Sequence, residues 1–251
     1  RSLLAQSLTG HAPWRSLPSQ VGSVKHALAP YCYRCPLNMS YPECGVACAS
    51  DVKELINTTT TGRVAGILAE PIQGVGGFIT PPDEYFQIVS DIIRKHGGVF
   101  ISDEVQTGFG RTGKMWGINH SGVEPDMITV AKGIANGMPL AAIITKKEIA
   151  DSLKKNTIST FGGNPVSCAA SKKTIDIIKR DKLEKNAKKT GLVLMDGLKK
   201  IQANHSKTIG DVRGKGLMIG LELVLDETTQ DRTPNPQAVD ALMEETKKRG
   251  L

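Results

Sequence analysis

The run Val99-Phe-Ile-Ser-Asp-Glu-Val105 decides the fold, because it has the pattern of a buried strand that ends in acidic residues. Before it, an amphipathic helix is predicted over Asp83–Lys95, and a second aliphatic strand over Val64–Ile72. Strand, helix and strand in this order predict a βαβ unit, in which two parallel strands end at the same edge of the sheet. Open α/β sheets bind ligands at that edge, so we expect Glu70 and Asp103 to lie near a ligand.

The chain continues with more strands and then becomes helical. The run Asp211–Leu225 alternates apolar and polar residues and predicts a single strand, so we expect a second domain to start near His205. We divide the chain into an irregular cysteine-containing segment of the large domain (residues 1–50), the main, ligand-binding part of the large α/β domain (51–204) and the beginning of a small α+β C-terminal domain (205–251). Further strands are expected at Met127–Ala131 and Leu140–Thr145, and further helices at Val52–Thr58, Lys146–Lys154, Pro165–Arg180 and Leu183–Asn204.

Composition excludes several classes of protein. The 251 residues are 39% hydrophobic and 23% charged, which is enough for a globular core and argues against disorder. The net charge of +7 comes largely from lysines at helical spacing with few aromatics between them, so we expect solvated helix faces rather than a nucleic-acid site. No apolar run approaches the roughly 18 residues of a membrane span.

Targeting and chain ends lead to two further expectations. We find no signal-peptide pattern and expect a cytoplasmic protein, or a mitochondrial one if the source is eukaryotic. The chain begins at Arg1 without a methionine and stops directly after a helical pattern in which Gly250 has the position of a C-cap. We therefore expect it to be truncated at both ends.

Two residues at strand ends point to one cofactor. Asp103 needs a positive partner, because desolvating a lone carboxylate is costly. Lys132 follows a strand, where partial desolvation would favour the nucleophilic free amine. Pyridoxal phosphate (PLP) needs both groups, a lysine to form a Schiff base and a carboxylate to hold its pyridine nitrogen protonated. The segment Ser159–Pro165 offers hydroxyls and a helix start for the phosphate, although it could equally be an ordinary Asn-Pro helix cap.

Four ordered motifs then carry a specific resemblance. They are Ala69-Glu-Pro-Ile-Gln-Gly74, Ile101-Ser-Asp-Glu-Val-Gln-Thr-Gly-Phe-Gly-Arg-Thr-Gly113, Pro125-Asp-Met-Ile-Thr-Val-Ala-Lys-Gly133 and Thr160-Phe-Gly-Gly-Asn-Pro165. Together they resemble the signatures of class III aminotransferases, which are PLP enzymes of fold type I. Within that class, the run Asp211–Gly220 is most similar to the alanine–glyoxylate aminotransferase type 2 branch. The resemblance implies a large domain with a mostly parallel sheet flanked by helices.

The resemblance also assigns roles around the cofactor ring. Lys132 would carry the cofactor and move the proton between the substrate α-carbon and the cofactor, and Asp103 would pair with the pyridinium nitrogen. Gln106 would hydrogen-bond the phenolic oxygen, Val105 would pack on the ring face opposite the substrate, and Glu70 would lie close by in a supporting role.

One role reaches beyond the single chain. Thr160 matches the residue whose hydroxyl reaches the phosphate of the neighbouring subunit's cofactor, so the resemblance implies a homodimer with its sites at the subunit interface. The family's Ser/Gly-rich phosphate loop, stacking aromatic ring and substrate-carboxylate arginine have no counterpart in these 251 residues.

The function implied is ping-pong transamination from an alanine-like or ω-amino acid donor to a 2-oxo acid such as glyoxylate or pyruvate. Val75 stands where relatives specific for ornithine carry an acid, which argues against such a specificity. Two alternatives remain open. One is a PLP-dependent phospho-lyase of the same fold, and the other is a non-catalytic or metal-binding scaffold.

Cysteines support the scaffold alternative. Cys32, Cys35, Cys44 and Cys48 could supply the four thiolates of a zinc or iron–sulfur site, although we favour reduced thiols, and disulfides are the least favoured of the three alternatives. Cys168 lies in a predicted helix, and we expect its side chain to be buried in the core.

Overall fold

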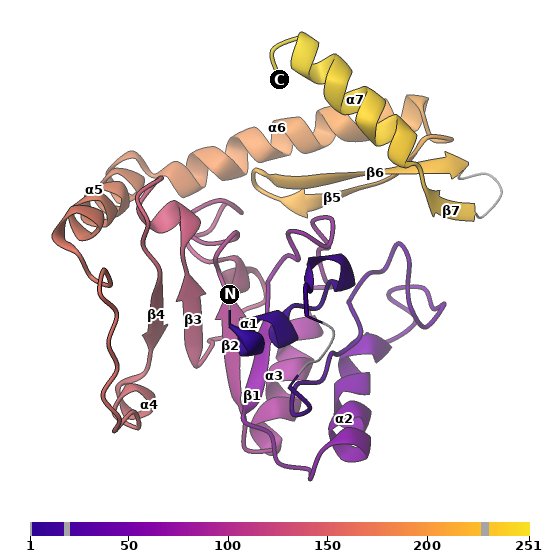
Figure 1. Ribbon diagram of the computed structural model, residues 1–251. Helices are drawn as coiled ribbons and strands as arrows, with labels where there is room; N and C mark the ends of the chain where they lie inside the picture. Colours follow the sequence, from indigo (N-terminus) through magenta and orange to yellow (C-terminus); the bar gives the residue numbers. More distant parts are fainter. Residues whose placement is uncertain (1, 18–20, 227–230) are drawn as a thin grey trace.

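Two sheets joined by long helices make up the protein (Figure 1), for which a computed structural model describes residues 2–17, 21–226 and 231–251. The first sheet consists of β1 (Gly66–Ala69), β2 (Val99–Asp103), β3 (Met127–Val130) and β4 (Ala142–Thr145), in that order. The pairs β1–β2 and β2–β3 are parallel, whereas β4 runs antiparallel to β3. Helix α3 (Tyr85–Lys95) connects β1 to β2, which confirms the predicted βαβ unit.

Helices α2 (Ala47–Thr59) and α3 cover one face of this sheet (Figure 1). Val89 of α3 and Phe100 of β2 have no exposed surface and belong to one core cluster. Because side chains alternate along a strand, Phe100 and Ser102 point toward these helices, and Asp103 points to the opposite face. The acid predicted to bind the cofactor therefore lies on the face that α2 and α3 leave free.

The second sheet is antiparallel and packs on the long helix α6 (Leu183–Asn204). In Figure 1, α6 lies above the first sheet. Met195 of α6 packs against Val212 and Leu223 in a core separate from that of the first sheet. The elements of this region are β5 (Ile209–Lys215), β6 (Met218–Asp226), β7 (Asp231–Pro234) and α7 (Pro236–Lys248).

The prediction of one strand over Asp211–Leu225 is wrong, because this run forms the hairpin of β5 and β6. Gly216 makes the turn with a φ of 58°. A Cβ at Gly216 would lie 2.4 Å from the carbonyl carbon of Thr112, so the turn needs glycine for its conformation and for its close contact with the large sheet's loop. Continuous apolar alternation across a tight turn hid this break from the sequence pattern.

Three helical predictions need comment. The helix α5 (Pro165–Asp181) is confirmed, and Oδ1 of Asn164 accepts a hydrogen bond of 3.0 Å from the amide of Ser167 as its N-cap. Of the predicted helix Lys146–Lys154, only Lys147–Ala150 is helical, and this segment is α4. Cys168 is exposed rather than buried, so its assignment to the core is wrong: it lies on a side of α5 that no described element covers.

Four short elements complete the description: the helix α1 (Leu3–Leu8) and the 3-10 helices η1 (Ala12–Trp14), η2 (Gly117–His120) and η3 (Lys132–Ile134).

Among the described residues, no helix is both long enough and apolar enough to cross a membrane.

An ionic cluster ties residues 31–34 to the second sheet. Glu222 of β6 accepts a hydrogen bond from the Tyr31 hydroxyl and pairs with Arg34 at 2.7 Å and with Arg213 at 2.7 Å. Arg213 also donates hydrogen bonds of 2.6 and 3.0 Å to the carbonyl oxygen of Gly77, in the loop that follows β1. The second sheet is thus linked both to the N-terminal segment and to a loop of the large sheet.

Candidate active site at the strand ends

Three predicted site residues lie at the C-terminal ends of neighbouring parallel strands. Glu70 follows β1, Asp103 ends β2, and Lys132 lies in η3, two residues after β3. Burial raises the pKa of the Glu70 carboxyl, and the charge of Asp103 raises it further, while the charge of Lys132 and the hydrogen bond from the Gly74 amide oppose the rise. The three charges are close enough to influence one another, which agrees with a shared site.

Asp103 occupies a polar patch on the open face of the sheet. Its Oδ1 accepts a hydrogen bond of 3.0 Å from the amide of Val105. Thr129 is its register partner on β3, so the two side chains share a face. Among the described residues, Oγ1 of Thr129 is buried without a hydrogen-bond partner. A buried hydroxyl without a partner beside a carboxylate fits a site that takes a polar ligand.

Gln106 is fixed against the loop after β1. The amide of Gly74 donates a hydrogen bond of 2.9 Å to Oε2 of Glu70. A Cβ at Gly74 would lie 2.3 Å from Nε2 of Gln106, so the glutamine side chain fills the space that any larger residue would need. Val105, in the same turn, is half-buried. Glu70, Val105 and Gln106 therefore lie close to the end of β2.

Lys132 has a strained backbone, with a φ of 44° that places this non-glycine residue in the left-handed region. Such strain recurs at functional sites, where the surrounding structure must hold the residue in place. The expected partial desolvation is not found, since Lys132 is exposed in this chain. It follows the sheet on its open face, where no described element covers it.

Glu104 is a functional candidate that sequence reasoning missed. It is completely buried, and its carboxylate accepts hydrogen bonds from two hydroxyls and two backbone amides. Its neighbour Asp103 drew attention because it ends the strand. The available signal was alternation along β2: Glu104 follows Phe100 and Ser102 on the buried face of the strand, where an acid must be compensated.

Thr160 is not brought together with the other predicted site residues. It lies in an exposed segment between α4 and α5. Among the described residues, no hydrogen bond or ion pair joins it to Asp103, Gln106 or Lys132.

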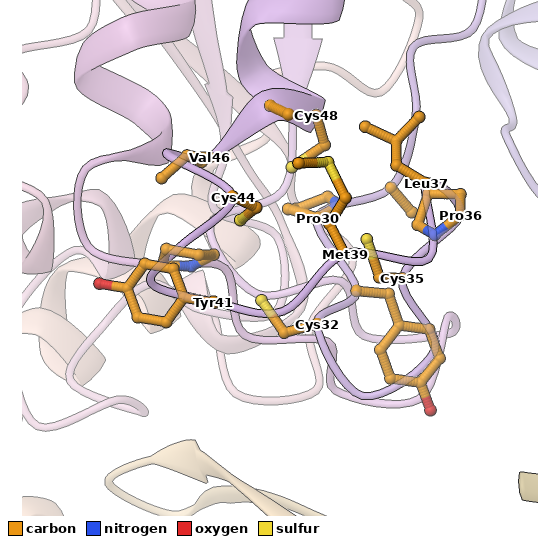
Figure 2. A pocket seen from close by; sticks show the side chains of 14 residues that line it. Pro30, Cys32, Cys35, Pro36, Leu37, Met39, Tyr41, Cys44, Val46 and Cys48 are labelled. Atoms are coloured by element: carbon orange, nitrogen blue, oxygen red, sulfur yellow. The ribbon is translucent and has the colours of Figure 1, made fainter. Parts of the chain in front are cut away.

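The four clustered cysteines line a small apolar pocket, together with Met39 and Tyr41 (Figure 2). All four cysteines are free thiols. Burial raises the pKa of Cys32 and Cys48, and the neighbouring thiols add to the rise, which favours the neutral thiol over the thiolate that binds metals. In the described part of the chain, no group of three or more His, Cys, Asp or Glu side chains has an arrangement that could hold a metal ion.

The fold and this strand-end arrangement define an α/β protein with the architecture of transaminases. A crystal structure of an amine transaminase from an uncultivated Pseudomonas species, in its PLP-bound form, superposes with a TM-score of 0.84 at 34% identity, covering 94% of this chain and 55% of that one. The family model for Aminotransferase class-III matches residues 1–251, and the chain belongs to that family.

Curated relatives agree with this assignment. Alanine–glyoxylate aminotransferase 2 homolog 2, mitochondrial, of Arabidopsis thaliana is 41% identical over 244 residues, which are 97% of this chain and 50% of the relative. Leucine/methionine racemase of Thermococcus litoralis is 41% identical over 233 residues, which are 91% of this chain and 52% of the relative. The chain thus spans about half the length of the curated relatives it matches.

Proposed function

We propose that this chain supplies the cofactor-binding part of a PLP-dependent transaminase, which exchanges an amino group by a ping-pong mechanism. The observation that carries the proposal is the placement of Asp103 and Lys132 at adjacent ends of β2 and β3, on the open face of the sheet. Family membership and the PLP-bound neighbour support the same cofactor. The partnerless hydroxyl of Thr129 beside Asp103 supports a polar ligand at this place.

PLP, when bound, supplies an aldehyde that bonds to amines and a ring that withdraws electrons from the substrate α-carbon. The Asp103 carboxylate would accept a hydrogen bond from the protonated ring nitrogen and so keep the ring electron-withdrawing. Gln106 would donate from its amide to the phenolic oxygen, and Val105 would pack on one ring face. Glu70, through its bond to the Gly74 amide, would keep the loop against Gln106 in place.

Lys132 would attach the cofactor and move the proton. Its amine would hold PLP covalently, and its free Nζ would take up the proton that leaves the substrate α-carbon and give it back. Its left-handed backbone lies directly after β3, which places Lys132 at the same edge of the sheet as Asp103.

For the substrates we propose an alanine-like or ω-amino acid donor and glyoxylate or pyruvate as acceptor. The name of the Arabidopsis relative supports this pair. Val75 in place of an acid argues against an ornithine-type switch. A phospho-lyase would need no 2-oxo acid, so amination of an added 2-oxo acid separates the two reactions.

A second candidate is racemisation of a neutral amino acid, which the equally similar Thermococcus relative favours. Removal and return of the α-proton at Lys132 would serve both reactions. Incubation with one enantiomer of leucine or alanine in the absence of a 2-oxo acid distinguishes them. Chiral chromatography would detect the opposite enantiomer for a racemase and an unchanged substrate for a transaminase.

We propose a homodimer in which the segment around Thr160 faces a second copy. Large apolar side chains near it are exposed, with Ile158 at 98% and Phe161 at 82%, which is unusual for a surface that stays in water. In the dimer the Thr160 hydroxyl would bind the phosphate at the partner's site. Light scattering coupled to size-exclusion chromatography, with Phe161→Ser as the weakened interface, tests this assembly.

We also propose the division into residues 1–50, 51–204 and 205–251, with the last as the start of a second domain. The separate core around Val212 and Leu223 supports that boundary. We also propose a cytoplasmic location, or a mitochondrial one if the source is eukaryotic, and the mitochondrial names of two relatives support the second.

Borohydride reduction in the presence of PLP tests the cofactor site directly. Peptide mass spectrometry then locates the reduced pyridoxyl group, both on the 251-residue chain and on the longer gene product if the gene encodes one. We expect the label on Lys132, and Lys146, exposed after a neighbouring strand, serves as the control lysine. Absence of label at Lys132 in every form of the protein would rule out the transaminase proposal.

A further inference from the structure

Glu104 joins three parts of the site by hydrogen bonds. Its Oε1 accepts from the Ser102 hydroxyl at 3.2 Å and from the Ile118 amide at 2.9 Å. Its Oε2 accepts from the Thr107 hydroxyl at 2.5 Å and from the Gly117 amide at 2.8 Å. Each carboxylate oxygen therefore holds one hydroxyl and one backbone amide.

The backbone of the same residue adds two more connections. The Glu104 amide donates to the carbonyl oxygen of Thr129 at 2.9 Å, which extends the pairing of β2 with β3 by one residue. Its carbonyl oxygen accepts from the Gly108 amide at 3.0 Å and closes the turn that carries Val105 and Gln106. This turn is thus held at both ends by one residue.

Close packing makes the arrangement rigid. A Cβ at Gly117 would lie 2.6 Å from Cβ of Thr107 and 3.0 Å from Cβ of Pro71, so the turn, the 3-10 helix η2 and the loop after β1 meet without free space. A displaced Glu104 carboxylate would leave the Gly117 and Ile118 amides buried without acceptors. The turn can therefore hardly move unless these bonds break.

We propose that Glu104 is the positioning residue of the cofactor site, and this inference rests on the proposed PLP function. Its carboxylate oxygens accept hydrogen bonds from four groups of the protein, so Glu104 would not contact PLP itself. It instead fixes the turn 104–108, so that the Val105 amide keeps donating to Oδ1 of Asp103 and Gln106 stays against Gly74. The site would then be preorganised before PLP arrives.

The variant Glu104→Gln tests this role with little change of shape. Its amide nitrogen must replace one carboxylate oxygen, and at either position it faces a backbone N–H donor, because Oε1 and Oε2 each accept from one. A hydroxyl can rotate to accept instead, but a backbone amide cannot. We expect the PLP dissociation constant to rise at least about tenfold, or about 1.4 kcal/mol, because PLP binding must then also order the turn that Glu104 no longer holds.

A milder pair of variants covers the case in which Glu104→Gln does not fold. Thr107→Val removes one hydroxyl donor to Glu104, and Thr112→Val removes a hydroxyl bonded to His120 instead. Both threonines are buried, at 0% and 1% exposure, so the two substitutions are matched. We expect Thr107→Val to weaken PLP binding and Thr112→Val to leave it at the wild-type value.

The readouts are PLP dissociation constants from absorbance titration, thermal unfolding of the cofactor-free protein, and hydrogen exchange at the Gly108 amide, which donates to the Glu104 carbonyl oxygen, all with the longest gene product. Weaker PLP binding and faster Gly108 exchange in folded Glu104→Gln or Thr107→Val support the proposal. Lower thermal stability with wild-type PLP binding would overturn it and leave Glu104 a purely structural residue. A wild-type protein that gains no label at Lys132 would overturn the proposed function itself, and the positioning role with it.

Discussion

Gly74 and Gln106 touch so closely that a Cβ on the glycine would lie 2.3 Å from Nε2 of the glutamine. The conflicting atoms belong to the far end of a flexible side chain, so Gly74→Ala can be accommodated if Gln106 moves. We expect a loss of stability below about 1 kcal/mol, since no backbone clash arises, but weaker PLP binding because Gln106 leaves its position.

Gly76→Ala is the matched control for that substitution. A Cβ there would lie 3.4 Å from its nearest neighbours, which is an ordinary contact. Thermal unfolding and PLP titration of both variants check the prediction. Equal PLP affinity in the two variants would show that Gln106 does not contact the cofactor.

Glu70→Gln should change how stability depends on pH. Burial raises the pKa of Glu70 above its ordinary 4.5, so ionisation of this carboxyl disfavours the folded state. The wild type should therefore match the variant below about pH 4 and become less stable than the variant as the pH rises through the folded pKa. The amide oxygen of the substituted side chain would still accept the Gly74 hydrogen bond, which isolates the effect of charge.

Thermal unfolding of both proteins in small pH steps from about pH 4 to 8 measures this difference. A difference in melting temperature that stays constant across the series would show that the carboxyl is not destabilised by burial.

Substitution of Lys132 should separate strain from chemistry. Left-handed backbone costs an L-residue about 1–2 kcal/mol, so Lys132→Gly should be more stable than Lys132→Ala, although neither variant can be labelled by PLP and borohydride. At Lys173, which is exposed in the interior of α5, the order should reverse, with alanine more stable than glycine. Chemical denaturation of the four variants provides the comparison, and the same order at both positions would contradict the strain at Lys132.

Strand ends were predictable because they depend on local pattern. Asp103 and Lys132 each follow a run of aliphatic residues, and parallel strands bring such ends to one edge without any knowledge of the packing. Glu104 was not predictable in the same way, since its role depends on amides of Gly117 and Ile118 that lie 13 and 14 residues further along the chain. Only the folded loop brings these donors to the carboxylate.

Turns and exposure were the other source of error. The hairpin at Gly216 depends on a contact with Thr112 that no local pattern records. Cys168 has apolar neighbours along α5 and yet faces solvent, because periodicity shows which residues share a side of a helix but not what covers that side. The exposure of Lys132 was missed for the same reason: its place after a strand does not show what covers it.

The Tyr31–Glu222–Arg213 cluster should contribute strongly to the stability of the C-terminal sheet. The side chains of Arg213 and Glu222 are 11% and 13% exposed, so Glu222→Gln would leave two arginines facing a neutral partner. We expect a loss of about 3 kcal/mol, as for breaking a largely buried pair. Tyr31→Phe should cost about 1 kcal/mol through its lost hydrogen bond.

The pH dependence of the Tyr31 contribution gives the sharper test. Burial, followed by the hydrogen bond to Glu222, raises the pKa of Tyr31 from 10.0 to about 12. The stabilisation from the protonated hydroxyl is therefore complete below pH 10 and is lost as the pH rises toward 12. Urea denaturation should show a stability gap between the wild type and Tyr31→Phe at pH 8 that narrows at about pH 11. Tyr41→Phe, which removes an exposed hydroxyl bonded to Glu84, should show little effect at pH 8, and an equal loss from both substitutions would show that burial of the cluster does not strengthen it.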